Sequence, residues 1–182
     1  MRTKYWVMLA AIALVMAQGT AAYAQLNSTA ASVNLNAVMS ESLSLSAAPG
    51  TVNFTPLNSN GVTNGDSAIT INTAWVLQTA KSDVYVYAYF ASTTALTNTT
   101  DATYTIPVGS VSGSVDGGAA TAFTGTSPFA AGSSLDVAHV NITGVNKNSS
   151  QSDTLDLSID TTGAGLPAGT YTGTLFIQAQ AI

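Results

Sequence analysis

The chain has 182 residues, with four Lys and Arg, nine Asp and Glu, a formal net charge of −5 and no cysteine. So few cations cannot neutralise a phosphate backbone, which makes nucleic acid a poor partner, and anionic membrane surfaces are disfavoured for the same reason. Without cysteine, the fold must be held by its core rather than by disulfides, and a transition-metal site lacks the ligands that it needs. We expect neither a metal nor a cofactor.

Residues 1–24 have the order of a secretory signal peptide. Two cations, Arg2 and Lys4, precede an unbroken apolar run, and small residues close the segment at Ala24. The apolar run is about 13 residues long, which is short of the roughly 20 that a membrane-spanning helix needs. We predict Sec-type export, through the periplasm if the host is Gram-negative, and cleavage after Ala24. No membrane insertion is expected afterwards, and residues 25–182 form one secreted or surface domain.

Apolar and polar residues alternate with a period of two along the rest of the chain, which is typical of half-buried β-strands. No stretch shows the spacing of an amphipathic helix. In chain order, the expected strands are 31–39, 43–45, 52–54, 69–77, 84–90, 113–123 as a hairpin, 135–142, 155–159 and 171–181.

Three local features refine this prediction. Asp116-Gly117-Gly118 supplies the positive backbone angles of a tight hairpin turn. The apolar parity changes within residues 135–142, which predicts a bulge near Ala138 or His139. We expect residues 144–152 to form a polar loop and Asp153 to face water.

Eight or nine short strands, with turn signals at intervals of about 8–12 residues, predict a single antiparallel β-sandwich. The sequence contains no internal repeat and no linker that would indicate a second domain.

Catalytic groups are scarce. His139 is the only histidine, and a catalytic base needs a nucleophile and an orienting acid within hydrogen-bond reach. No Gly-x-Ser-x-Gly motif is present. We expect a structural or surface histidine and no enzymatic activity. Asp153, Asp156 and Asp160, or the loop 58–66, offer oxygen ligands that Ca²⁺ prefers, but their spacing matches no known loop and favours a solvated surface.

Tyr85, Tyr87 and Tyr89 form a stripe on one face of an expected strand. The stripe is compatible with a platform for surface glycans or with a subunit contact, where tyrosine is enriched. The third interpretation is structural, with cross-strand aromatic pairs that stabilise the sheet.

The C-terminal sequence "LPAGTYTGTLFIQAQAI" contains Gly169, Thr170 and Tyr171, with Gly169 fourteenth from the C-terminus. It resembles the closing strand of secreted bacterial pilin-like sandwiches, namely the spore coat protein U-type domains and the chaperone–usher pilins. Alternating apolar residues follow the matched tripeptide: Leu175, Ile177, Ala179 and Ala181.

The resemblance implies an immunoglobulin-like fold that assembles by donor-strand complementation. In that group a periplasmic chaperone first supplies the missing strand, and the N-terminal extension of a neighbouring subunit later replaces it, through main-chain hydrogen bonds and side-chain pockets. Residues 31–39 are the candidate donor; alternatively, they form the first strand of their own sandwich. The expected strand-pairing interface comprises Val33, Leu35, Ala37, Met39, Gly169, Tyr171, Leu175, Ile177 and Ala179.

The sequence therefore favours an exported, non-enzymatic structural or adhesive subunit of the cell surface, a pilus-like fibre or an extracellular matrix, with further copies of itself as the expected partner. The alternative is a carbohydrate-binding module that uses the tyrosine stripe.

Overall fold

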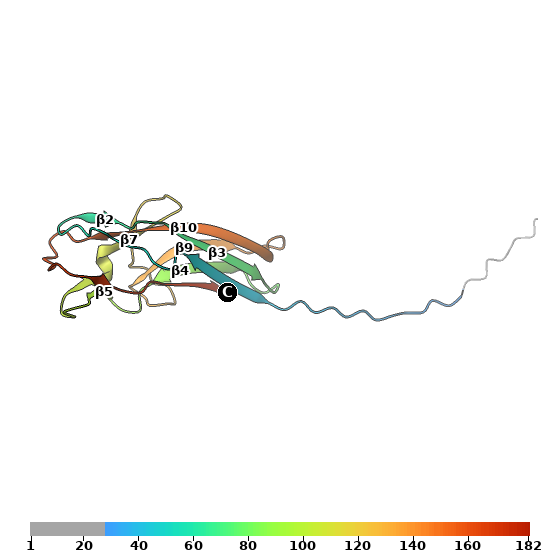
Figure 1. The fold of residues 1–182 in the computed structure, drawn as a ribbon. Coiled ribbons are helices and arrows are strands. Elements are labelled where there is room, and N and C mark those ends of the chain that lie inside the picture. Colours follow the sequence, from blue (N-terminus) through green and yellow to red (C-terminus); the bar gives the residue numbers. More distant parts are fainter. Residues whose placement is uncertain (1–27) are drawn as a thin grey trace, which may run out of the picture. The chain divides into compact units, whose positions relative to one another are not determined.

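The computed structural model describes residues 28–182, which belong to two separate units, residues 1–38 and residues 39–182. The described part of the first unit, residues 28–38, contains neither helix nor strand (Figure 1). The predicted signal peptide lies outside the described residues. Over residues 28–182, no helix is long and apolar enough to cross a membrane.

The second unit is built from antiparallel sheets, which confirms the predicted all-β sandwich. Apart from one 3-10 turn, every regular element in the described residues is a strand. The elements in chain order are β1 (Ser42–Ala48), β2 (Val62–Asn64), β3 (Ile69–Val76), β4 (Asp83–Tyr89), β5 (Thr94–Asn98), β6 (Thr105–Pro107), η1 (Val108–Ser110), β7 (Val111–Val115), β8 (Thr121–Ala122), β9 (Ser134–Asn141), β10 (Asn148–Asp160), β11 (Tyr171–Thr172) and β12 (Phe176–Ala181).

The predicted number of eight or nine strands is wrong, because the described residues contain twelve. One additional strand, β2, has only three residues, and the predicted strand 171–181 counts as two because it is divided into β11 and β12. A strand as short as β2 shows no recognisable alternation in the sequence.

The twelve strands form three sheets, all with antiparallel pairing. The largest has the order β1-β3-β10-β7-β8, with β2 paired to β10 beside this path. The second has the order β12-β4-β9 and the third the order β11-β5-β6. Figure 1 shows β3, β4, β9 and β10 running along the length of the body.

The core is formed by the apolar faces of strands from the first two sheets, together with Ala95 of β5 and Ile106 of β6 from the third. In β3, and in β10 from residue 153 to residue 159, every second side chain is buried, including Ile69 and Ile71 from β3 and Leu155 from β10. These pack in one cluster with Val86 and Ala88 of β4. Burial of each Ile, Leu or Val side chain stabilises the fold by about 1.5–3 kcal/mol. The apolar positions of the alternating pattern therefore supply the free energy that packs the sheets together.

The predicted hairpin is present. Asp116 and Gly117 have φ values of +50° and +70°, and the Gly118 N–H donates to the Val115 carbonyl oxygen at 2.8 Å. Positive φ at both central residues is the requirement of a type I′ turn, which Gly117 meets without steric cost.

The predicted bulge is also present. Val86 pairs with Ala138, whereas Tyr87 pairs with Asp136, so Val137 is the additional residue in β9. The bulge lies one residue before the predicted position. The extra residue shifts the alternation of the strand. Leu135 and Val137 are therefore buried, although the apolar residues later in the strand have the other parity.

Three expectations are corrected. Residues 52–54 form no strand, although Val52 and Phe54 pack against the core. The polar stretch 148–152 belongs to β10 rather than to a loop. Asp153 does not face water: it shares the parity of Leu155 and is buried.

The predicted strand 171–181 is divided at Gly173. Its first part, β11, pairs with β5, and its second part, β12, pairs with β4 in another sheet. A Cβ atom at Gly173 would overlap the backbone carbonyl of Ala95. A residue without a side chain is therefore required where the chain passes between sheets.

We expect Gly173→Ala to destabilise the protein by about 1–3 kcal/mol, because inserting an atom into a packed site forces a backbone shift. Urea denaturation followed by circular dichroism measures this change. Gly144→Ala is the matched control, since a Cβ atom at Gly144 meets nothing within 4 Å. Equal stability of the two variants would contradict the steric explanation.

Candidate strand-pairing site and the aromatic face

Among the edge strands of the three sheets, β1 and β12 form the candidate site. In residues 28–182, β1 pairs only with β3 and β12 pairs only with β4. These two edge strands come from different sheets and lie next to each other, near the C-terminal end marked in Figure 1. Their outer backbone N–H and C=O groups form a template for an additional strand.

The sheet order explains why this edge is open. An immunoglobulin sandwich has the strand order A-B-E-D in one sheet and C-F-G in the other. Here β1-β3-β10-β7 corresponds to A-B-E-D, and β4 and β12 correspond to C and F. Within the described residues no strand occupies the position of G beside β12.

The side chains at this edge are apolar and incompletely covered. They are half-buried and pack against the core from one side, in contrast to the fully buried centre of the sandwich. From β1 and from the end of the chain, they are Leu43, Leu45, Leu175, Ile177, Ala179 and Ala181. An added strand would cover this apolar surface and pair with the free backbone at the same time.

The predicted interface residues of the C-terminal segment divide into two groups. Leu175, Ile177 and Ala179 lie at the open edge, whereas Gly169 and Tyr171 lie beside β5, in the third sheet. The Tyr171 hydroxyl donates to the Pro167 carbonyl oxygen at 3.0 Å.

Sequence reasoning did not assign Leu43 and Leu45 of β1 to the interface. The signal was present as the alternation of "SLSLS", but alternation does not show that a strand lies at an edge.

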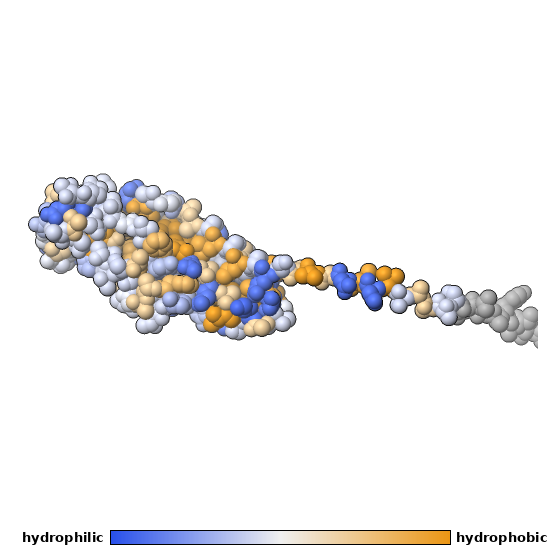
Figure 2. Space-filling model, turned by 90° about the horizontal axis from the view of Figure 1, so that it is seen from below, coloured by the Kyte–Doolittle hydropathy of each residue, from blue (hydrophilic) through white to orange (hydrophobic). Residues whose placement is uncertain are grey.

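The N-terminal part of the predicted interface is exposed. Val33, Leu35 and Met39 have exposed fractions of 80%, 90% and 79%, and Ala37 is also exposed. Residues 28–41 form no strand, so the structure does not use residues 31–39 as the first strand of the sandwich; that strand is β1. Figure 2 shows hydrophobic and hydrophilic residues exposed along this segment.

The tyrosine stripe lies in β4, the central strand of its sheet. Tyr85 stacks on His139 with ring centroids 4.2 Å apart, and Tyr89 stacks on Phe129 at 5.6 Å. Tyr87 contacts Phe129 edge-on and is only 8% exposed. The rings therefore pack mainly on one another and on cross-strand neighbours, which supports the structural interpretation of the stripe.

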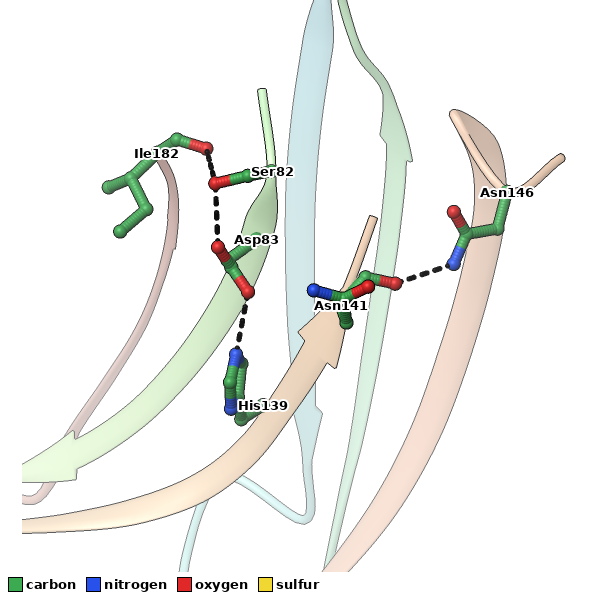
Figure 3. Close-up of polar contacts among 6 residues, drawn as sticks. All are labelled: Ser82, Asp83, His139, Asn141, Asn146 and Ile182. Atoms are coloured by element: carbon green, nitrogen blue, oxygen red, sulfur yellow. Dashed lines mark hydrogen bonds and ion pairs between the residues drawn. The ribbon is translucent and has the colours of Figure 1, made fainter. Parts of the chain in front are cut away.

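His139 is hydrogen-bonded to a carboxylate at the end of the same sheet. Its Nε2 lies 2.8 Å from Asp83 Oδ1, and the Ser82 hydroxyl donates to Asp83 Oδ2 at 2.6 Å (Figure 3). The serine thus bonds to the carboxylate and not to the imidazole, whereas a nucleophilic triad requires the imidazole to accept the serine proton.

Ser82 and Asp83, together with Lys81, also form hydrogen bonds to the end of β12 and to Ile182. The Ser82 N–H donates to the Ile182 carbonyl oxygen at 2.7 Å, and the Ile182 N–H donates to the Asp83 carbonyl oxygen at 3.0 Å. Lys81 Nζ donates to the Ala181 carbonyl oxygen at 3.2 Å. The edge strand is therefore held firmly on its β4 side.

We expect Asp83→Asn to weaken the acid dependence of stability. The hydrogen bond from Ser82, followed by the contact with His139, lowers the pKa of the Asp83 carboxyl. A lowered pKa in the folded state adds stability above the ordinary pKa, and this stability is lost as the pH falls through the folded pKa. Denaturation midpoints between about pH 6 and pH 2 should therefore fall less steeply in the variant than in the wild type. The control is Asp156→Asn, which removes an exposed carboxylate of β10; an identical slope in Asp83→Asn and wild type would contradict the linkage.

No family model and no curated protein matches the chain. A similar solved structure is described as "Chaperone-tip adhesin complex is vital for synergistic activation of CFA/I fimbriae biogenesis", with a TM-score of 0.46 and 14% sequence identity. The match covers 76% of this chain and 42% of that chain. The chain thus spans less than half the length of that structure's chain, and a likeness of this degree assigns no family.

Proposed function

We propose that the protein is an exported, non-enzymatic structural or adhesive subunit that polymerises by strand addition. Residues 31–39 of one copy occupy the open edge between β1 and β12 of the next copy. The observation that carries this proposal is the combination of an uncovered apolar edge with an exposed, alternating segment in the same chain.

The edge strands lack the usual protection against pairing. Proteins normally block exposed edges with charge, proline or a covering loop. Neither β1 nor β12 contains a charged residue or proline. Their free backbone groups and half-buried apolar side chains favour pairing with another strand over contact with water.

The proposed donor fits this edge in length and pattern. Nine extended residues span about 30 Å, and the six residues of β12 span about 20 Å. Val33, Leu35, Ala37 and Met39 lie on one face of an extended chain, with Asn34, Asn36 and Val38 opposite. The uniformly apolar face covers the groove, while the face with the two asparagines remains in water.

Insertion into the same molecule is less favourable than insertion into a neighbour. A direct return of residues 31–39 along β1 would need a tight turn at Ser40-Glu41. Two-residue hairpin turns prefer Gly, Asn or Asp, because their central residues adopt positive φ. Ser40 and Glu41 do not meet this preference.

Export through the signal peptide and transient capture by a periplasmic chaperone belong to the same proposal. A chaperone that supplies a strand would protect the open edge until a second copy replaces it. The proposed location is the cell surface, a fibre or an extracellular matrix.

The alternative of carbohydrate binding through the tyrosine stripe has less support. Tyr87 is covered and one face of Tyr85 is occupied by His139, which leaves little free aromatic surface for a sugar ring.

Deletion of residues 25–39 tests the proposal. Negative-stain microscopy and size-exclusion chromatography should show fibres for the full secreted chain and monomers for the deletion variant. A second variant in which a Gly/Ser linker of equal length replaces residues 25–39 separates sequence from length. Fibres that persist unchanged in both variants would refute strand addition by this segment.

A further inference from the structure

A polar cluster interrupts the sandwich core. Thr73 of β3 and Asp153 of β10 are 1% and 3% exposed, and Gln151 beside them is half-buried. Thr73 lies between Ile71 and Trp75, which belong to separate apolar clusters. Buried hydroxyl and carboxyl groups at such positions are costly unless they are paired.

The sheet register brings these side chains together. Gln151 is directly opposite Thr73, and Asp153 is opposite Ile71, the next inward position of β3. Side chains of directly opposite residues have Cβ atoms about 4.5–5.5 Å apart, and diagonal neighbours are also within reach. The side chains of Thr73 and Gln151 are therefore neighbours on the inner face.

The hydrogen bonding of the cluster is incomplete in a specific way. Gln151 Nε2 donates to Asp153 Oδ1 at 2.5 Å. Within the described residues, Asp153 Oδ2 and Thr73 Oγ1 have no hydrogen-bond partner. Each unsatisfied buried polar atom costs free energy, and such atoms in a native structure require an explanation.

The protonation of Asp153 is also unusual. Burial raises the pKa of its carboxyl above the ordinary value, although the hydrogen bond from Gln151 acts in the opposite direction. A carboxylate whose pKa is raised accepts a proton more readily than an ordinary aspartate does, which is the property that a general base needs.

We propose that Thr73 and Gln151 form an intramolecular ester bond, with Asp153 as the group that transfers the proton. Thr73 supplies the hydroxyl nucleophile and Gln151 the carbonyl carbon. Asp153 already contacts the nitrogen that leaves, through Oδ1, and has a second oxygen without a partner.

The reaction balances without an added reagent. Rotation of the two side chains first brings Thr73 Oγ1 within hydrogen-bond reach of Asp153 Oδ2, and Oγ1 then bonds to Gln151 Cδ as the hydroxyl proton passes to Asp153. The Cδ–Nε2 bond then breaks, Asp153 returns the proton to Nε2, and the nitrogen leaves as ammonia. No atom is oxidised or reduced, and Asp153 ends in its starting state.

The bond would join β3 to β10, which are adjacent strands in the largest sheet. It would lock the chain between residues 73 and 151 within one subunit, in a protein without disulfides. This inference goes beyond the proposed function and does not depend on it, because the bond forms within a single copy.

Mass spectrometry of the secreted protein tests the proposal. After signal removal, the chain contains only Lys81 and Lys147 as trypsin sites, so Thr73 and Gln151 fall on different peptides. We expect trypsin digestion of the denatured protein to yield these two peptides joined, lighter than their sum by one ammonia. Mild alkali should separate them and leave Glu at position 151.

Matched variants identify the reacting groups. Thr73→Val retains the shape but removes the hydroxyl, so its peptides should be separate and of full mass. Thr70→Val, at an exposed position of the same strand, should retain the link. Asp153→Asn should slow link formation, as followed by the linked fraction over time.

Other ammonia losses are distinguishable from the link. Cyclisation of Gln25, or of Asn in the Asn60-Gly61 and Asn64-Gly65 pairs, also releases ammonia but leaves the two peptides separate. Separate peptides from the wild-type protein, at full mass or with such a loss in one peptide, would overturn the proposal. A link that persists in Thr73→Val would also overturn it.

Discussion

Replacing Val33 and Leu35 together by aspartate is expected to abolish polymer formation while leaving the β-sandwich body folded. Both side chains are highly exposed in the single chain, so their loss does not affect the core. In the assembled state each would enter the apolar edge between β1 and β12. Two buried aliphatic side chains contribute at least about 3 kcal/mol, which corresponds to roughly 100-fold in affinity, and burying two carboxylates adds a further penalty.

The matched control is the double variant Asn34→Asp and Asn36→Asp. It adds the same charge to the same segment, but on the face opposite to Val33 and Leu35. Fibre length by negative-stain microscopy and subunit exchange by light scattering should remain near wild type in this control. Loss of polymer in both variants would indicate a general effect of charge and would contradict the proposed apolar insertion.

The fold class was predictable because the strongest strands carry an uninterrupted alternation. In β3 and β10, every inward position of the predicted strands is apolar or small enough to be buried, and the period of two fixes which face is inside. The hairpin at Asp116-Gly117 was predictable from turn chemistry alone. These signals are local, so they can be recognised in the sequence without knowing which strands are neighbours in the sheet.

The errors arose where a local signal was ambiguous. Asp153 has the parity of the buried leucines that follow it, but its charge led to the prediction that it faces water. In the structure it is buried, with a raised pKa and a hydrogen bond from Gln151. Tyr171 and Ile177 share one parity although they belong to different sheets. The break at Gly173 depends on the nearby backbone of Ala95, which the sequence does not show.

The candidate site was predictable only in part, for a similar reason. Alternation identified residues 31–39 and the apolar residues of β12. Whether a strand lies at an edge depends on the order of strands in the sheet, which is a property of distant pairings. The position of Leu43 and Leu45 at the open edge therefore became visible only from the order of strands in the sheet.

The largest effect on stability is expected for Phe123→Ala. Phe123 is fully buried and packs edge-on against Phe90, with ring centroids 5.2 Å apart. The neighbouring Gly113 belongs to the same tightly packed region, because a Cβ atom there would lie only 2.5 Å from Leu135 and 2.8 Å from Leu155. Truncation removes the transfer free energy of the ring and leaves a cavity in a region that strands on both sides hold rigid, so we expect a loss of about 3–5 kcal/mol.

Urea denaturation of the wild type and of two variants measures this loss. Phe176→Ala is the matched control, because Phe176 is 42% exposed and stacks only on the outer face of the sheet with Tyr89. Its change should be well below that of Phe123→Ala, since it leaves no enclosed cavity. An equal shift of the denaturation midpoint in both variants would contradict the enclosed packing described for Phe123.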